Sequence, residues 1–139
     1  MALDAYTFSY PPVMAHPSGI LVNNAAGYAK GHTGTMTVSV VDATTVFKAD
    51  AALYKIFIKN DAGAFLFVGK VSAIANATTI TVGGGLLHAL THLDELYVEL
   101  DAIFNKEMAE RGVTNNGKVV AFESDVIRGE MTYTILYDT

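Results

Sequence analysis

The chain has 139 residues, of which 51% are hydrophobic and only 17% charged, with a formal net charge of −5 at pH 7 and no cysteine. This length suits one domain with appendages, and the absence of cysteine excludes disulfides, thiolate nucleophiles and cysteine metal sites. The nine basic residues are scattered along the chain, which argues against a nucleic acid partner.

The first residues and the hydropathy pattern bear on localisation. Met1-Ala-Leu-Asp4 opens with an acid, whereas a secretory signal begins with basic residues. No apolar run approaches the roughly 20 residues of a membrane span. We therefore expect a soluble protein without a membrane partner, made and assembled in a cytoplasm.

Residues 1–33 are predicted to form an extended N-terminal arm. Adjacent prolines at positions 11 and 12 impose an extended path and argue against a helix or a central strand. The segment is too rich in aromatic and aliphatic residues for an ordinary disordered tail. We expect it to lie either over its own domain or on a neighbouring subunit. The predicted contact residues are Tyr6, Phe8, Tyr10, Pro11, Pro12, Val13, Met14, Ile20 and Leu21.

Residues 34–139 are predicted to form a β-domain with its core at 34–100. Met36, Val38 and Val40 alternate with polar residues, which is typical of a strand with one buried face. Further strands are expected at 54–59, 65–74, 78–82 and 96–100, with turns at 61–63 and 76–77. The strand at 54–59 is apolar on both faces, which indicates a central strand or an interface.

The C-terminal third is predicted to hold one short helix and two strands. Asp101 is expected to cap a helix that continues to position 111, with Ile103, Phe104 and Met108 near one stripe. Strands are expected at 118–123 and 131–137. The fold class is thus mainly β: a small antiparallel β-sandwich or barrel with an N-terminal arm and a short helix near 101–111.

Catalytic, metal and cofactor sites are not predicted. Gly83-Gly84-Gly85 lacks the spacing of a phosphate-binding loop and is expected to be a turn. His88 and His92 would share one face of a short helix, but no third metal ligand is evident, so we expect a structural role. No serine lies in the turn that hydrolases use. We therefore expect a protein that is not an enzyme.

Several motifs between residues 34 and 100 follow one another at close spacing. They are Gly34-Thr35, a strand ending in Thr44-Thr-Val-Phe47, Val68-Gly-Lys-Val-Ser-Ala-Ile74 and Ala77-Thr-Thr-Ile-Thr-Val82. This order resembles the small β-domains of structural proteins of tailed bacteriophages. The resemblance implies a virion protein, namely a capsid decoration or cement protein on the capsid exterior.

Such a protein would bind the major capsid protein and copies of itself, and we expect a homotrimer. Two alternatives remain. The first is a tail or head-tail joining protein of the virion. The second is a carbohydrate-binding β-sandwich whose aromatic platform would use Tyr54, Phe57, Phe65 and Phe67, although core packing also explains these residues.

Overall fold

The structure is a computed structural model that describes residues 3–10, 15–47, 54–110, 119–127 and 130–138. The chain divides into two compact units. The barrel unit comprises Met14–Glu107, and the terminal unit comprises Met1–Val13 together with Met108–Thr139. Strands dominate both units, which confirms the predicted mainly-β class.

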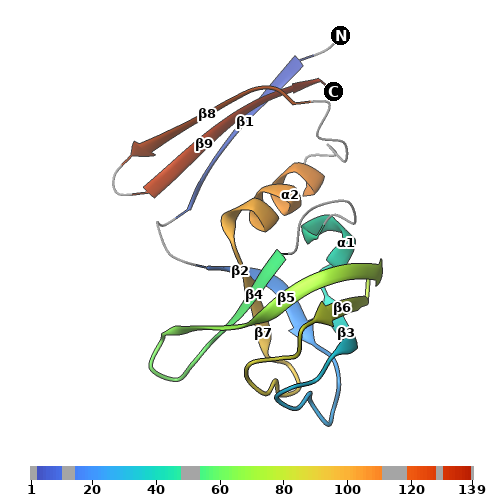
Figure 1. The fold of residues 1–139 in the computed structure, drawn as a ribbon. Coiled ribbons are helices and arrows are strands. Elements are labelled where there is room, and N and C mark those ends of the chain that lie inside the picture. The colour runs from blue at the N-terminus through green and yellow to red at the C-terminus, as the bar shows by residue number, and fades with distance from the viewer. Residues whose placement is uncertain (1–2, 11–14, 48–53, 111–118, 128–129, 139) are drawn as a thin grey trace. The chain divides into compact units, whose positions relative to one another are not determined.

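The barrel unit contains a closed antiparallel barrel of six strands in the order β2-β3-β6-β5-β4-β7 (Figure 1). β7 pairs with both β4 and β2, which closes the sheet and leaves none of these strands at a free edge. The strands are β2 (His16–Val22), β3 (Gly34–Val40), β4 (Tyr54–Lys59), β5 (Phe65–Asn76), β6 (Thr79–Gly83) and β7 (Glu95–Val98).

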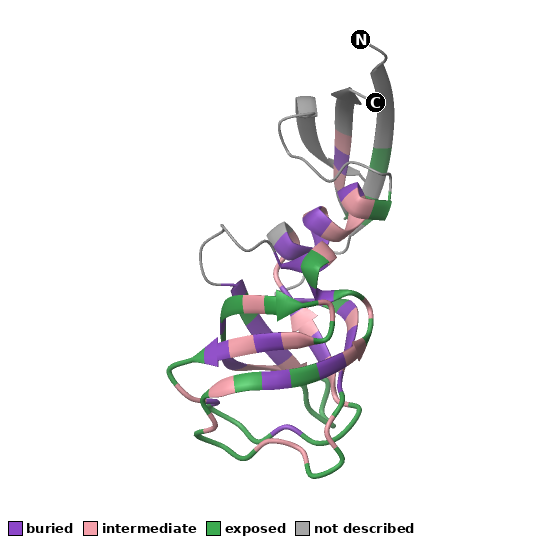
Figure 2. Cartoon of the chain, turned by 90° about the vertical axis from the view of Figure 1, so that its right-hand side faces the viewer, coloured by how far each residue is buried: buried purple, intermediate pink, exposed green. Residues whose placement is uncertain are grey.

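Aliphatic side chains fill the barrel interior, and buried and exposed positions alternate along the strands (Figure 2). The fully buried strand residues are Ile20, Val22, Met36, Val38, Ile56, Val68, Ile80, Val82, Leu96 and Val98. Val40 was expected on the buried face with Met36 and Val38, but it is 77% exposed. Its φ of 75° turns the backbone out of the strand, so the alternation ends before it.

The predicted arm is wrong for residues 16–22, because they form β2, a strand of the barrel itself. The register of β2 against β7 shifts between Pro17 and Leu21, which marks a bulge. A bulge is one of the few places where a sheet accepts proline. Ser18 supports it from inside by donating to the carbonyl of Leu96 and accepting from the amide of Ile20. Pro17 therefore lies within a strand of the barrel, whereas the prediction made for Pro11 and Pro12 concerns positions outside the described residues.

Two polar turns form the β4-β5-β6 meander, as predicted. Asn60, and not Asp61, closes the first turn, since its side chain accepts from the amide of Ala64 at 2.9 Å. Gly63 supplies the positive φ there. In the second turn, the Asn76 side chain accepts from the amide of Thr78 at 3.0 Å. Asparagine favours turns because its side chain can bond to backbone groups a few residues on, here four residues from Asn60 and two from Asn76.

The helix α1 (Ala43–Val46) stands where the sequence predicted the end of a strand. Asp42 caps it by accepting from the amide and hydroxyl of Thr44. This local pairing favours a helical turn over continued strand. Phe47 follows, is buried, and lies against the ring of Tyr54 at a centroid distance of 5.4 Å.

The helix α2 (Leu100–Glu110) confirms the predicted helix, but Asp101 lies inside it rather than at its cap. Ile103 and Met108 are buried as expected, whereas Phe104 is only half-buried and Asn105 is buried instead. Asn105 donates to the Val46 carbonyl and to the Tyr54 hydroxyl, both at 3.0 Å. In the described part of the chain, neither helix is long and apolar enough to cross a membrane.

The terminal unit is a three-stranded antiparallel sheet in the order β1-β9-β8. Its strands are β1 (Leu3–Tyr10), β8 (Val119–Ile127) and β9 (Glu130–Asp138). The two C-terminal strands were predicted, although β8 extends past its expected end at 123. The start of the predicted arm is instead β1, which pairs with β9 from Leu3–Asp138 to Tyr10–Met131. β1 and β9 therefore lie side by side although they come from opposite parts of the chain.

Candidate functional site: an aromatic and basic face of the barrel

Cross-strand pairs on β4 and β5 build the candidate site. Lys55 pairs with Lys70, and Phe57 pairs with Phe67. Phe67 and Lys70 are three residues apart, and a regular strand would send them to opposite faces. A bulge between these pairs sets Val68 as an extra residue on β5, which shifts the alternation by one. Phe67 and Lys70 therefore meet on the outer face.

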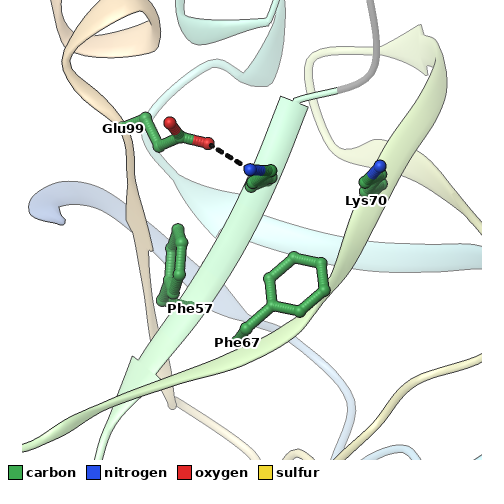
Figure 3. A pocket seen from close by; sticks show the side chains of 5 residues that line it. Phe57, Phe67, Lys70 and Glu99 are labelled. Atoms are coloured by element: carbon green, nitrogen blue, oxygen red, sulfur yellow. Dashed lines mark ion pairs between the residues drawn. The ribbon is translucent and has the colours of Figure 1, made fainter. Parts of the chain in front are cut away.

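Together with Glu99, these four residues line an open hollow of about 440 Å³ (Figure 3). Phe57 is only 5% exposed and forms its floor. The Phe57 and Phe67 rings lie 5.6 Å apart between centroids and are tilted by 58°. A volume of this size lies within the range of small-ligand sites.

Of the two lysines that line the hollow, one has an acidic partner, and the other has none that the structure describes. Glu99 Oε1 lies 3.9 Å from Lys55 Nζ, and both side chains are close to half exposed. Water screens such a pair, so it contributes little stability. Lys70 has no ion-pair partner among the described residues. Its ammonium group is therefore available to an anionic partner.

The aromatic surface continues beyond the hollow. Tyr97 on β7 pairs with Phe57 across the sheet, and its ring lies 5.4 Å from that of Phe65. Lys59 Nζ sits 5.8 Å from the centre of the Phe65 ring, within the range of a cation–π contact. We call the four aromatic residues the aromatic face: Phe57, Phe65, Phe67 and Tyr97.

A second hollow of about 160 Å³ adjoins the first, because Phe67 and Lys70 line both. Its other walls are Gly69, the Gly83–Gly85 turn and Leu87, whose side chain is 49% exposed. The amide of Leu87 donates to the carbonyl of Val68 at 2.9 Å, which holds this loop beside β5. The triple glycine is a turn, as predicted, with positive φ at Gly84 and Gly85.

The structure does not gather the predicted contact residues into one site. Ile20 lies in the barrel interior and Leu21 is half-buried on the same strand. Tyr6, Phe8 and Tyr10 lie on β1 in the terminal unit. Pro11, Pro12, Val13 and Met14 fall outside the described residues.

The predicted aromatic platform is only partly correct. Phe57, Phe65 and Phe67 do share the outer face, but Tyr54 is buried and bonded to Asn105. The sequence did not identify Tyr97, Lys70 or Glu99, which come from three different segments. The one available signal was that β4 is apolar on both faces, which correctly indicated a central strand.

The helix expected around His88 and His92 is absent. Both histidines are exposed in the loop between β6 and β7. They therefore do not share the helical face that would have brought the two imidazoles together. Among the described residues, no group of three histidine, cysteine or acidic side chains is placed to hold a metal ion.

Comparisons with protein-family models, with curated proteins and with solved structures find no significant match to this chain.

Proposed function

We propose that this protein is a virion structural protein that binds and stabilises a phage capsid shell as a decoration or cement protein. The observation that carries this proposal is the partly exposed aromatic face of the barrel, with Lys55, Lys59 and Lys70 at its margins. Aromatic anchors in an apolar centre with charged residues at the rim are typical of protein–protein interfaces.

The side chains of the hollow are better suited to binding a protein surface than to catalysis. The hollow presents two phenylalanine rings, two lysines and one acid, and Lys55 is already beside Glu99. Phenylalanine contributes contact area without a group that transfers protons or electrons. A decoration protein needs such surfaces, since each copy must adhere to its neighbours and to the shell.

The order of motifs between residues 34 and 100 supports the virion assignment. Under this proposal the partners are the major capsid protein and two further copies of the chain. A tail or head-tail joining protein would use the same kind of surface and differs only in where the protein docks.

The aromatic face also supports a second candidate, carbohydrate binding. Sugars stack on exposed, flat aromatic surfaces, and Phe65, Phe67 and Tyr97 are each partly exposed. However, the paired rings are tilted by 57° and 58° to one another, and Phe57 is nearly covered. This geometry favours an interlocking protein surface over a flat sugar platform.

A binding experiment tests the proposal. The full-length protein is mixed with capsids assembled from the major capsid protein encoded beside its gene, and bound protein is measured by co-sedimentation. Phe67→Ser should weaken binding by about tenfold or more, as expected for an interface anchor. Leu93→Ser is the matched control, because Leu93 is exposed and apolar but lies outside the aromatic face.

Wild-type protein that fails to sediment with the capsids, or a gene without virion genes beside it, would refute the proposal. Light scattering tests the trimer separately, and a monomer at all concentrations would remove that part. A glycan array tests the second candidate. Binding to a defined glycan that Phe67→Ser abolishes would favour it over the capsid.

A further inference from the structure

We propose that the two adjoining hollows form one groove that binds an extended acidic peptide segment of a partner protein. In this arrangement an apolar side chain of the segment packs on Phe57 and Phe67, and a neighbouring carboxylate binds Lys70. The inference rests on the proposed assembly function and specifies the kind of segment that the aromatic face takes.

The first argument is the local charge. The chain as a whole carries a net charge of −5, yet three lysines and one acid line the groove or contact the aromatic face. These are Lys55, Lys59, Lys70 and Glu99. A basic patch on an acidic protein attracts anionic partners and repels basic ones.

The second argument is the position of Lys70. It lines both hollows, as Phe67 does, so Lys70 lies where they adjoin. At the far end of the larger hollow, Glu99 lies beside Lys55 and would repel a second carboxylate there. The acidic group of the segment is therefore expected at Lys70, towards the glycine turn.

The third argument is the open backbone at the glycine turn. A methyl group added at Gly84 would meet no heavy atom within 4 Å. On the other side Leu87 offers a half-exposed apolar wall. This end of the groove has room for a chain that continues past Lys70.

The closed barrel restricts how the segment binds. β4 and β5 each lie between two partner strands, and the amide of Leu87 donates to the carbonyl of Val68 where β5 extends beyond its pairing with β6. Side chains fitting into the groove therefore supply the recognition that we propose. This predicts dependence on the identity of apolar and charged residues in the segment.

A single-stranded nucleic acid is the other anion that uses aromatic and basic residues. Such ligands need a path of cations and open ring faces on which bases stack. Here Phe57 is nearly covered and Lys55 is beside Glu99, so within the described part of the chain Lys70 is the groove lysine without an ion-pair partner. The observations favour the peptide.

The test uses nuclear magnetic resonance on the isotope-labelled full-length protein. Two probes are compared: the peptide Ac-Gly-Asp-Phe-Glu-Leu-Gly-NH2 and its counterpart with lysine in place of both acids. The acidic peptide should shift amide signals at Lys55, Phe57, 67–70 and 83–87, and the basic peptide should not. Oligothymidylate serves as the nucleic acid probe.

Charge reversal at Lys70 provides the decisive variant. Lys70→Glu should weaken binding of the acidic peptide by about tenfold, which corresponds to about 1.4 kcal/mol, and should strengthen binding of the basic one. Lys30→Glu is the matched control. Lys30 is exposed in a loop and lines neither hollow, and its substitution makes the same change in net charge.

The inference is overturned if the acidic peptide shifts no groove signal at about 1 mM, where binding worth about 4 kcal/mol would be detected. It is also overturned if both peptides bind equally, or if oligothymidylate alone occupies the groove. These results are independent of capsid co-sedimentation. Lys70→Glu protein that still binds capsids as wild type does would refute the groove while leaving the proposed function standing.

Discussion

Replacing Gly19 by alanine tests whether residues 16–22 are a barrel strand held in a bulge. Gly19 has a φ of +80°, and a methyl group built there would lie 2.7 Å from Cγ2 of Val41. Its amide donates to Oε2 of Glu95 at 3.1 Å, so the backbone is fixed in place. An alanine must therefore accept both a strained backbone and a collision.

The two costs can be estimated separately. The left-handed conformation costs an alanine about 1–2 kcal/mol relative to glycine, and the crowding adds about 1–3 kcal/mol. The stiffer unfolded chain returns about 0.4–1 kcal/mol. With the middle of each range, Gly19→Ala should lower the unfolding free energy of the barrel by about 3 kcal/mol.

The assay is urea denaturation followed by the methyl signals of Ile20 and Val22, which lie in the barrel interior. Signals from one unit are needed because two units need not unfold together. With a urea slope of about 1–3 kcal/mol per M, the midpoint should fall by about 1–2 M.

Val41→Ala supplies the control. In that background the collision is absent, and Gly19→Ala should cost only about 1 kcal/mol, so the difference between the two backgrounds measures the crowding. A cost below about 0.5 kcal/mol, or the same cost in both backgrounds, would show that the bulge is not packed as described.

Three further predictions concern stability. Asn105→Ala should lower the unfolding free energy by about 1–3 kcal/mol, because the carbonyl of Val46 loses its donor; no change in urea midpoint would contradict this. Val40→Asn should raise the unfolding free energy by about 1 kcal/mol, since asparagine tolerates positive φ better than a β-branched residue. Val40→Thr should leave the unfolding free energy unchanged. Burial lowers the pKa of His16 from its ordinary value of 6.5. Near and below that pH the folded chain therefore binds fewer protons than the unfolded chain. The contribution of His16 to the unfolding free energy is thus fully present above pH 6.5 and decreases as the pH falls below it. Urea midpoints at pH 7.5 and 5.5 should therefore differ more for wild type than for His16→Gln, and equal differences would contradict the reasoning.

Alternation and turn chemistry made much of the barrel predictable. The strand at Met36 and Val38 alternates cleanly, and the segments around Asn60 and Asn76 carry side chains that stabilise turns by local hydrogen bonds. Such features act over a few residues. They remain readable without knowledge of the rest of the chain.

β2 was not predictable in this way. Pro17 and Gly19 weaken a strand by local criteria, and only the distant partners Leu96 and Glu95 make the bulge favourable. The same applies to Val40, whose exposure depends on a backbone reversal rather than on residue type. In both cases a contact or conformation set by the whole barrel overrides the local preference.

The candidate site depended even more on tertiary structure. The alternation along β5 places Phe67 and Lys70 on opposite faces, and the bulge at Val68 reverses that assignment. Tyr97 and Glu99 reach the site because β7 lies next to β4 in the closed barrel.

The mainly-β class, the β4-β5-β6 meander and a helix near residue 101 could be predicted from residue order, because they follow from short-range patterns of apolar residues and turn formers. Long-range pairing in the folded chain was needed to show that β2 closes the barrel, that β1 pairs with β9, and that aromatic residues of three strands share one outer face. These features depend on pairing across a sheet and on the offset of a bulge, and the partners that set them can be far apart in the chain, such as Leu3 and Asp138 or Phe8 and Tyr133 in the terminal unit.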